Sequence, residues 1–266
     1  MLFETLGDEK NPAVLFFHAM GVTAKSSERV AKYLEKDYFC IMPTSTAYCR
    51  GQRYLGKEDE IRQIEEFLKI HGVEKLELVA ASSLGADLAL AFLSRSKVAV
   101  NRVFFDGGQF AAIKKPLRML AVPFMYLVLK ALYLLDGKFL GKVLWCDDEN
   151  IRPYFVEGGK NVTFGNLRRM LSDSLEDKPL PKLSEKLQRR IFFEFGSAEE
   201  HFKYRNAVMS AYPCGNFPVF EGFNHMQFQI ADPKGFAHML RYVSDTGRMP
   251  QLAFLREEGT ESEIRH

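Results

Sequence analysis

Short apolar runs alternate along this chain with segments of helical periodicity, and this alternation limits the folds that it can adopt. Each run is four or five residues long and rich in β-branched or aromatic side chains, as buried strands are. The six runs are residues 13–17, 38–42, 76–80, 102–105, 191–195 and 217–220. Strands that alternate with helices pair in parallel. We therefore predict an α/β fold with a mostly parallel sheet and helices on both faces.

The interval between residues 105 and 191 breaks this alternation. It is mostly helical in pattern, and it far exceeds the ~2–6 residues that usually connect elements in such folds. Ligands of open parallel sheets bind beyond the carboxyl ends of the strands, so an insertion at that edge would cover the binding crevice. We predict a core formed by residues 1–110 and 188–250, a helical cap or lid at 111–187, and a mobile polar tail at 251–266.

Charge and hydropathy exclude several classes of partner. The chain has 36 basic and 34 acidic residues, a net charge of +2, which gives no strong field to attract nucleic acid or an anionic membrane. Residues 116–135 form the most membrane-like segment, but Arg118, Lys130 and Pro123 interrupt it. We expect helices that cover an apolar site there, and neither nucleic acid nor a membrane as a partner.

Compartment and cofactor expectations follow from what the sequence lacks. The N-terminal stretch MLFETLGDEKNP has no apolar core of signal-peptide length, so we expect a cytoplasmic protein. The cysteines at 40, 49, 146 and 214 are widely spaced, which favours free thiols over disulfides or a zinc site. Without a GxGxxG or Walker loop, no nucleotide cofactor is expected. No metal is expected either.

The stretch VAASSLGADLALAF ends a predicted strand on two serines and continues as a helix. Ser83 then lies in a tight turn at the carboxyl edge of the sheet, where a strained backbone costs about 1–3 kcal/mol. The small residues Ala81 and Gly85 flank that turn. The segment ASSLG resembles the nucleophile elbow, G-x-S-x-G, of the α/β-hydrolase family. Two alternatives stay open, namely Ser82 as the nucleophile and a serine that only caps the helix.

The stretch LFFHAMG at residues 15–21 resembles the H-G-x-G loop of the same family, with Ala19 where glycine is usual. In that family this loop and the residue after the nucleophile donate backbone N–H groups to the developing oxyanion. The resemblance therefore implies Met20 and Leu84 as the two donors. For His18 we favour a buried, hydrogen-bonded role that orders the loop over a role in proton transfer.

A nucleophilic serine needs a base, and the base needs an acid that orients it. The loop EGFNHMQF resembles the family's terminal G-x-x-H loop and implies His225 as the base. The stretch IFFEFGSAEEHF places Glu199 three residues after Gly196, where the family carries its acid. Asp106, in RVFFDGGQF, and Glu200 are alternative acids.

Ser83, Glu199 and His225 occur in the Ser, acid, His order of this family. The resemblance spans about residues 13–242, and it implies a serine hydrolase that works through an acyl-enzyme without a cofactor. The apolar cap favours carboxylic esters of small to medium apolar substrates, so a carboxylesterase is expected. Thioester, amide and carbon–carbon bond hydrolysis and acyl transfer use the same triad and stay open. A ligand-binding protein without catalysis is the alternative from another class.

Overall fold

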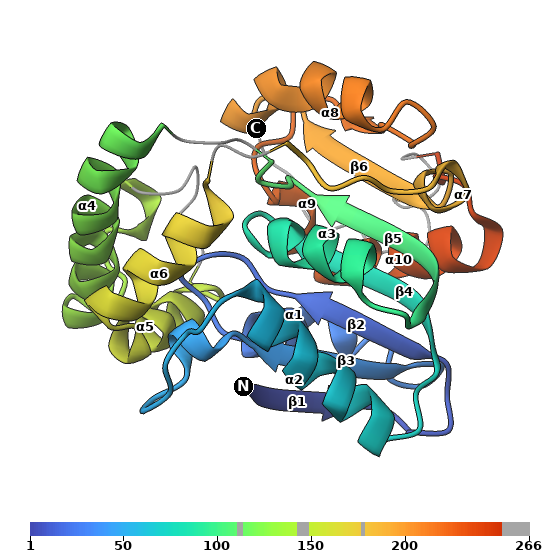
Figure 1. The fold of residues 1–266 in the computed structure, drawn as a ribbon, viewed down its shortest axis with the longest axis horizontal. Coiled ribbons are helices and arrows are strands. Elements are labelled where there is room, and N and C mark those ends of the chain that lie inside the picture. Colours follow the sequence, from blue (N-terminus) through green and yellow to red (C-terminus); the bar gives the residue numbers. More distant parts are fainter. Residues whose placement is uncertain (111–113, 143–148, 177–178, 252–266) are drawn as a thin grey trace.

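The computed structural model describes residues 1–110, 114–142, 149–176 and 179–251, and a seven-stranded sheet forms its centre (Figure 1). The strand order is β1-β3-β2-β4-β5-β6-β7. All neighbours pair in parallel except β1, which is antiparallel to β3. The predicted fold class is therefore confirmed. The strands are β1 (Leu2–Leu6), β2 (Ala13–Phe17), β3 (Phe39–Thr44), β4 (Lys75–Ser82), β5 (Ala99–Asp106), β6 (Ile191–Gly196) and β7 (Val219–Phe220).

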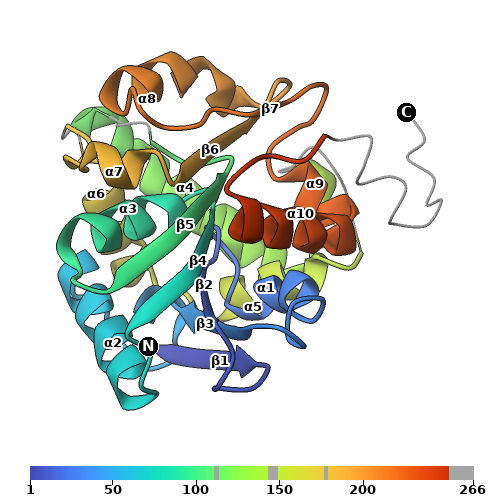
Figure 2. The same cartoon turned by 90° about the vertical axis from the view of Figure 1, so that its right-hand side faces the viewer.

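Helices cover both faces of the sheet (Figure 2). The helices α2 (Lys57–Ile70), α3 (Gly85–Arg95) and α8 (Arg205–Ala211) pack on one face. The helices α1 (Lys25–Ala31) and α10 (Pro233–Thr246) pack on the other. The remaining helices are α4 (Lys115–Leu134), α5 (Arg152–Asn161), α6 (Phe164–Ser174), α7 (Glu185–Gln188), α9 (Gln227–Ala231) and the short 3-10 helices η1 (Thr46–Tyr48), η2 (Leu140–Lys142) and η3 (Glu200–Tyr204).

Burial on both faces explains why the central strands are continuous apolar runs. Every residue of β2 is buried, and Leu15 contacts one core while its neighbours Val14 and Phe16 contact the other. Strands covered by helices on both sides have no solvent face and need no polar alternation. The predicted run at 13–17 coincides with β2 for this reason.

The other predicted strands lie within three residues of the observed bounds, except that β7 is only the last two residues of its run. One strand was not predicted. β1 has the sequence LFETL and is partly exposed along its length, because it forms the antiparallel edge of the sheet beside β3. A half-exposed edge strand needs no continuous apolar run, so the pattern that identifies central strands does not identify this one.

Helices α4 to α6 follow β5 in the chain and stand beside the carboxyl ends of the strands (Figure 1). A third cluster of buried apolar residues joins them to the sheet, with Leu129 and Leu171 on the helical side and Tyr48, Leu84 and Ile230 on the other. This segment lies within the predicted cap at 111–187. The predicted tail, from residue 252 onward, and Cys146 lie outside the described residues, in which Cys40, Cys49 and Cys214 are free thiols.

Candidate active site

Ser83 occupies the turn between β4 and α3 with a positive φ of 51°. Non-glycine residues rarely adopt this left-handed conformation, and holding one there costs about 1–3 kcal/mol. Two hydrogen bonds fix the turn to the end of β5: the Ser83 N–H donates to the Asp106 carbonyl (3.0 Å), and the Gln109 N–H donates to the Ser83 carbonyl (2.9 Å). The strained turn is therefore braced by the neighbouring strand.

Close packing of α3 against β2 explains the small residue two positions after Ser83. A Cβ atom at Gly85 would lie 2.5 Å from the Phe17 carbonyl oxygen and 2.6 Å from that of His18. Within the described residues no side chain caps α3, whose N-cap residue is Leu84, so the capping alternative does not describe this turn. The Ser82 hydroxyl instead lies at the end of β4, where it accepts a hydrogen bond from the Gln229 side chain.

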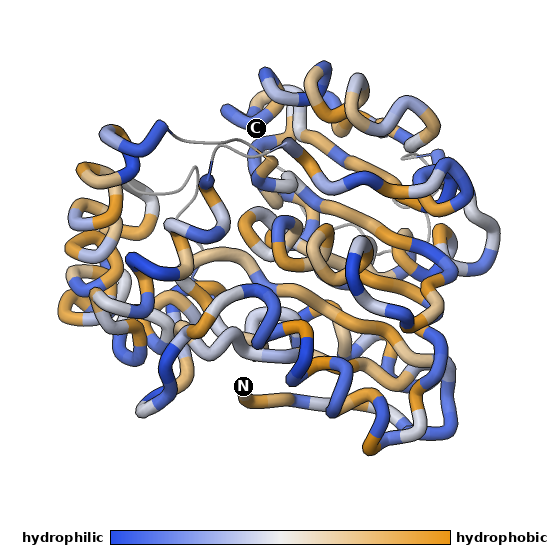
Figure 3. Tube along the Cα trace, in the orientation of Figure 1, coloured by the Kyte–Doolittle hydropathy of each residue, from blue (hydrophilic) through white to orange (hydrophobic). Residues whose placement is uncertain are grey.

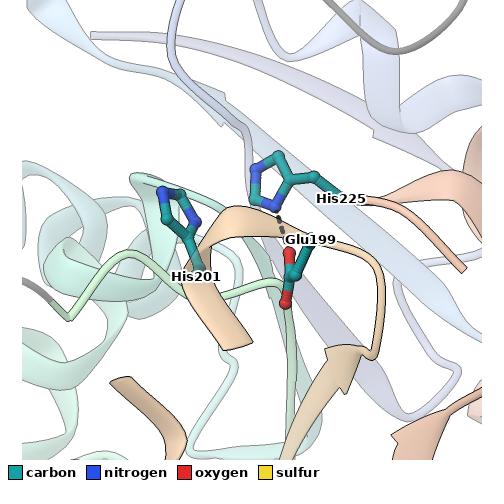
Figure 4. Close-up of side chains that lie close together, drawn as sticks. All are labelled: Glu199, His201 and His225. Carbon is teal, nitrogen blue, oxygen red and sulfur yellow. Dashed lines mark hydrogen bonds and ion pairs between the residues drawn. The ribbon is translucent and has the colours of Figure 1, made fainter. Parts of the chain in front are cut away.

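The predicted base and acid are hydrogen-bonded to each other. His225 Nδ1 lies 2.6 Å from Glu199 Oε2, and the Glu199 side chain is only 1% exposed (Figure 4). Main-chain contacts join the two loops that carry them. The Ala198 N–H donates to the Phe223 carbonyl, and a Cβ atom at Gly196 would lie 2.2 Å from that same oxygen. This glycine is therefore required by the approach of the histidine loop.

Gly107 connects the serine turn to the histidine and the acid. It follows Asp106, whose carbonyl accepts the Ser83 N–H. A Cβ atom at Gly107 would lie 2.5 Å from His225 Nδ1 and 3.0 Å from Glu199 Oε2. The main chain at 106–107 therefore contacts the Ser83 turn and also borders the Glu199–His225 pair, so all three residues lie beside this segment at the carboxyl edge of the sheet.

The alternative acids have different surroundings. Glu200 is exposed at the start of η3. Asp106 is buried and accepts a hydrogen bond from Gln229 Nε2. Burial raises the pKa of Asp106 to about 6, and the hydrogen bond from Glu194 partly opposes that rise. In the structure, Glu199 is the acid that is hydrogen-bonded to His225.

Glu194 is a buried acid that the sequence analysis missed. It lies beside Asp106 in the β5–β6 register and is 2% exposed. Burial, followed by the nearby Asp106 carboxylate, raises the pKa of Glu194 well above its usual value. A hydrogen bond joins the Glu194 and Asp106 side chains. The signal in IFFEF was the single acid in an otherwise apolar strand.

The predicted oxyanion donors both line one apolar pocket. Met20 and Leu84 border it together with Tyr48, Tyr54 and Met170. In the described part of the chain, neither the Met20 N–H nor the Leu84 N–H has an acceptor in the protein. Backbone donors without a partner beside a pocket are suited to binding a negatively charged oxygen.

His18 orders the loop that carries Met20. Its Nε2 accepts the Ser45 N–H (3.1 Å), so Nδ1 carries the proton that it donates to the Ala19 carbonyl (2.8 Å). Burial lowers the pKa of His18 to about 4. A neutral histidine bonded through both nitrogens has the expected ordering role. The Gly21 N–H completes this arrangement by donating to the Tyr48 hydroxyl (2.8 Å).

A second histidine, His201, stands beside the Glu199–His225 pair (Figure 4). Its ring is perpendicular to that of His225, with the ring centroids 4.8 Å apart. One ligand atom from each of the three residues lies within 4.8 Å of the others. Two imidazoles and a carboxylate are a ligand set that zinc accepts. This group could hold a metal ion, and the sequence analysis did not anticipate it.

No protein-family model matches the chain, and no curated protein matches it by sequence. Solved structures do match. They include an α/β-hydrolase family protein from Desulfitobacterium hafniense (17% identity, TM-score 0.69, covering 91% of this chain and 99% of the other). An esterase from Exiguobacterium antarcticum matches at 14% identity with TM-score 0.70 (92% and 95%). A carboxylesterase from Bacillus subtilis matches at 10% with TM-score 0.65 (93% and 88%). The chain has the α/β-hydrolase fold.

Proposed function

We propose that this protein is a serine hydrolase in which Ser83 is the nucleophile, His225 the base and Glu199 the acid. The observation that carries the proposal is the strained Ser83 turn at the same sheet edge as the hydrogen-bonded Glu199–His225 pair. Strain in the backbone of a non-glycine residue persists where the surrounding structure enforces it, and such residues cluster at active sites.

The geometry supports a two-step acyl transfer. Ser83 Oγ attacks the carbonyl carbon of the substrate while His225 Nε2 takes the hydroxyl proton, because Nδ1 is engaged by Glu199. The imidazolium then gives that proton to the leaving alcohol as the acyl-enzyme forms. In the second step His225 takes a proton from water, which attacks the acyl carbon. The imidazolium then returns that proton to Ser83 Oγ as the bond to the acyl group breaks and the carboxylic acid leaves.

Electrostatic stabilisation of the tetrahedral intermediate is the role that we assign to the Met20 and Leu84 N–H groups. Their place beside one pocket supports this assignment. Removing one such donor typically costs about 10²–10³-fold in turnover. The positive end of α3, which begins at Gly85, points the helix dipole toward the same region.

A carboxylic ester of small to medium size is the substrate class that we propose. The pocket that borders Leu84, the residue after Ser83, is lined mainly by apolar and aromatic side chains, among them Met170 and Tyr54, which favours an apolar acyl or alcohol group. Solved structures of the same fold include an esterase and a carboxylesterase, which supports this choice as an analogy.

Kinetics on p-nitrophenyl esters of increasing acyl length test the proposal. Ser83→Ala should lower kcat at least ~10³-fold, whereas Ser82→Ala, which removes the neighbouring hydroxyl, should keep most of the activity. Turnover that survives Ser83→Ala, or that disappears only in Ser82→Ala, would contradict the assignment. Parallel assays on thioesters and amides identify which acyl bond is preferred.

A further inference from the structure

Helix α4 and the residue after it carry most of the exposed large apolar side chains of the described chain. Thirteen large apolar side chains are exposed in the described residues, and eight of them lie between residues 117 and 135. Figure 3 shows this helix, largely in the apolar colour, at the outer edge of the molecule. Five of the eight share the outer face of the helix and are 61–75% exposed: Leu117, Leu120, Phe124, Leu127 and Leu134. Exposed apolar patches on this scale indicate a binding surface.

The opposite face of α4 packs against α5. Leu129 and Leu132 are buried, and a Cβ atom at Gly159 of α5 would lie 2.2 Å from the Leu129 carbonyl oxygen. Lys130 Nζ donates to the Gly159 carbonyl (2.7 Å). The helix is therefore held on α5 by one side, and its most apolar 18-residue window is only 17% buried.

The charge of this segment indicates what covers the outer face. Residues 114–138 contain one acid, Asp136, and five basic residues, of which Lys130 is bonded to α5 on the inner face. Lys115 and Arg118 lie in the first turn of α4, with Lys114 immediately before it. Basic residues at a helix N-terminus oppose the helix dipole, so these positions are unfavourable in the isolated molecule. Anionic groups at this end of the helix would offset both the basic charge and the dipole.

We propose that the outer face of α4 docks on the surface of an anionic lipid bilayer, with the helix lying along the surface. An apolar stripe flanked by basic residues is typical of helices that bind in this way. The helix is long and apolar enough to cross a membrane, and it continues through Pro123 without the interruption that the sequence suggested. Its inner face, however, is packed on α5, which favours a helix that lies on the bilayer over one that spans it.

This proposal replaces the expectation that the protein has no membrane partner. That expectation rested on the net charge of +2 for the whole chain and on the interrupted span. Neither criterion detects a local basic segment combined with an apolar face on one helix. The orientation of α4, on which the proposal depends, becomes visible only in the folded chain.

Docking would bring the membrane close to the candidate active site. A Cβ atom at Gly21 would lie 2.9 Å from Leu129 Cδ2, so the inner face of α4 packs directly on the loop that follows Met20. This step rests on the proposed function. If the protein is an esterase, its substrate would be an ester with an apolar chain that reaches the active site from the lipid bilayer.

Flotation with lipid vesicles tests the docking surface without measuring hydrolysis. The wild-type protein should float with phosphatidylcholine vesicles that contain phosphatidylglycerol, and much less with phosphatidylcholine alone. Leu120→Asp should lower the partition coefficient at least ~10-fold, because it places a charge in the apolar stripe. Ile70→Asp is the matched control: Ile70 and Leu120 are both 74% exposed, but Ile70 ends α2, away from α4. The control should bind as wild type does.

Two further variants separate the possible outcomes. Lys114→Glu combined with Lys115→Glu should remove the preference for anionic vesicles. Ser83→Ala should float as wild type does, so the docking result is independent of the catalytic assignment. Wild-type protein that binds neither vesicle, or equal losses in Leu120→Asp and Ile70→Asp, would overturn the proposal. A wild-type dimer in sedimentation that Leu120→Asp disperses, with no vesicle binding, would assign the face to a second copy instead.

Discussion

Replacing Gly107 by alanine tests whether the main chain at 106–107 sets the position of the His225 imidazole. The added Cβ atom would lie 2.5 Å from Nδ1 and 2.7 Å from Cε1 of His225, and 3.0 Å from Glu199 Oε2. Ordinary contacts begin at 3.4 Å. The ring must therefore move by about 1 Å, away from the position that its hydrogen bond to Glu199 defines.

A displacement of that size has a predictable effect on the rate. Misplacing a catalytic group by about 1 Å costs on the order of 10²-fold, or about 2.7 kcal/mol in the transition state. A second effect acts on stability, because Gly107 has a φ of 57°. Forcing alanine into the left-handed region costs roughly 1–2 kcal/mol. We expect kcat/KM to fall at least ~10²-fold in a protein that is still folded.

Gly72→Ala separates the two effects. Gly72 has a φ of 66°, but an added Cβ atom there meets nothing within 4 Å. Gly72→Ala should lose stability in urea unfolding through backbone strain alone and keep its activity on a p-nitrophenyl ester, whereas Gly107→Ala should lose both stability and activity. Wild-type activity in Gly107→Ala, or equal activity losses in the two variants, would refute the geometry.

Three other predictions concern neighbouring groups. Glu199→Gln should lower kcat by roughly 10³-fold or more with a small change in KM, because His225 loses its orienting carboxylate; a loss below tenfold would show that another acid serves. Burial lowers the pKa of His18 from 6.5 to about 4. Between these pH values the unfolded state binds more protons than the folded state, so the free energy of unfolding should rise by up to about 3 kcal/mol from pH 4 to 6.5. His18→Gln should reduce this rise in urea titrations at several pH values, and an unchanged rise would refute the cause. Zinc should inhibit the enzyme by binding Glu199 and His225, and His201→Gln should raise the inhibitory concentration at least ~10-fold; equal sensitivity would exclude His201 as a ligand.

The architecture could be predicted because burial on both faces of the sheet leaves a strong pattern. The central strand β2 coincides with its predicted run, since helices cover both of its sides. The edge strand β1 could not be identified in this way, because its residues are partly exposed and do not have to be continuously apolar. The turn at Ser83 was predictable because strand, serine, small residues and helix are all local.

The parts that the sequence did not reveal depend on neighbours that are distant along the chain. In the sequence, Gly107 looks like an ordinary turn glycine, and only the folded structure shows that the His225 ring lies next to it. In the sequence, Glu194 is one polar residue in an apolar strand, and only the strand pairing places Asp106 beside it. The outward face of α4 could not be distinguished from the inward one, since both are apolar and only packing on α5 separates them.

Mass spectrometry of the protein treated with a fluorophosphonate probe tests the central claim most directly. If Ser83 is activated by His225 and Glu199, one adduct should form on the peptide that contains Ser82 and Ser83, and fragmentation should place it on Ser83. Labelling should vanish in Ser83→Ala and slow at least ~10²-fold in His225→Ala. Folded protein that stays unlabelled, or an adduct on Ser82 or elsewhere, would contradict the account.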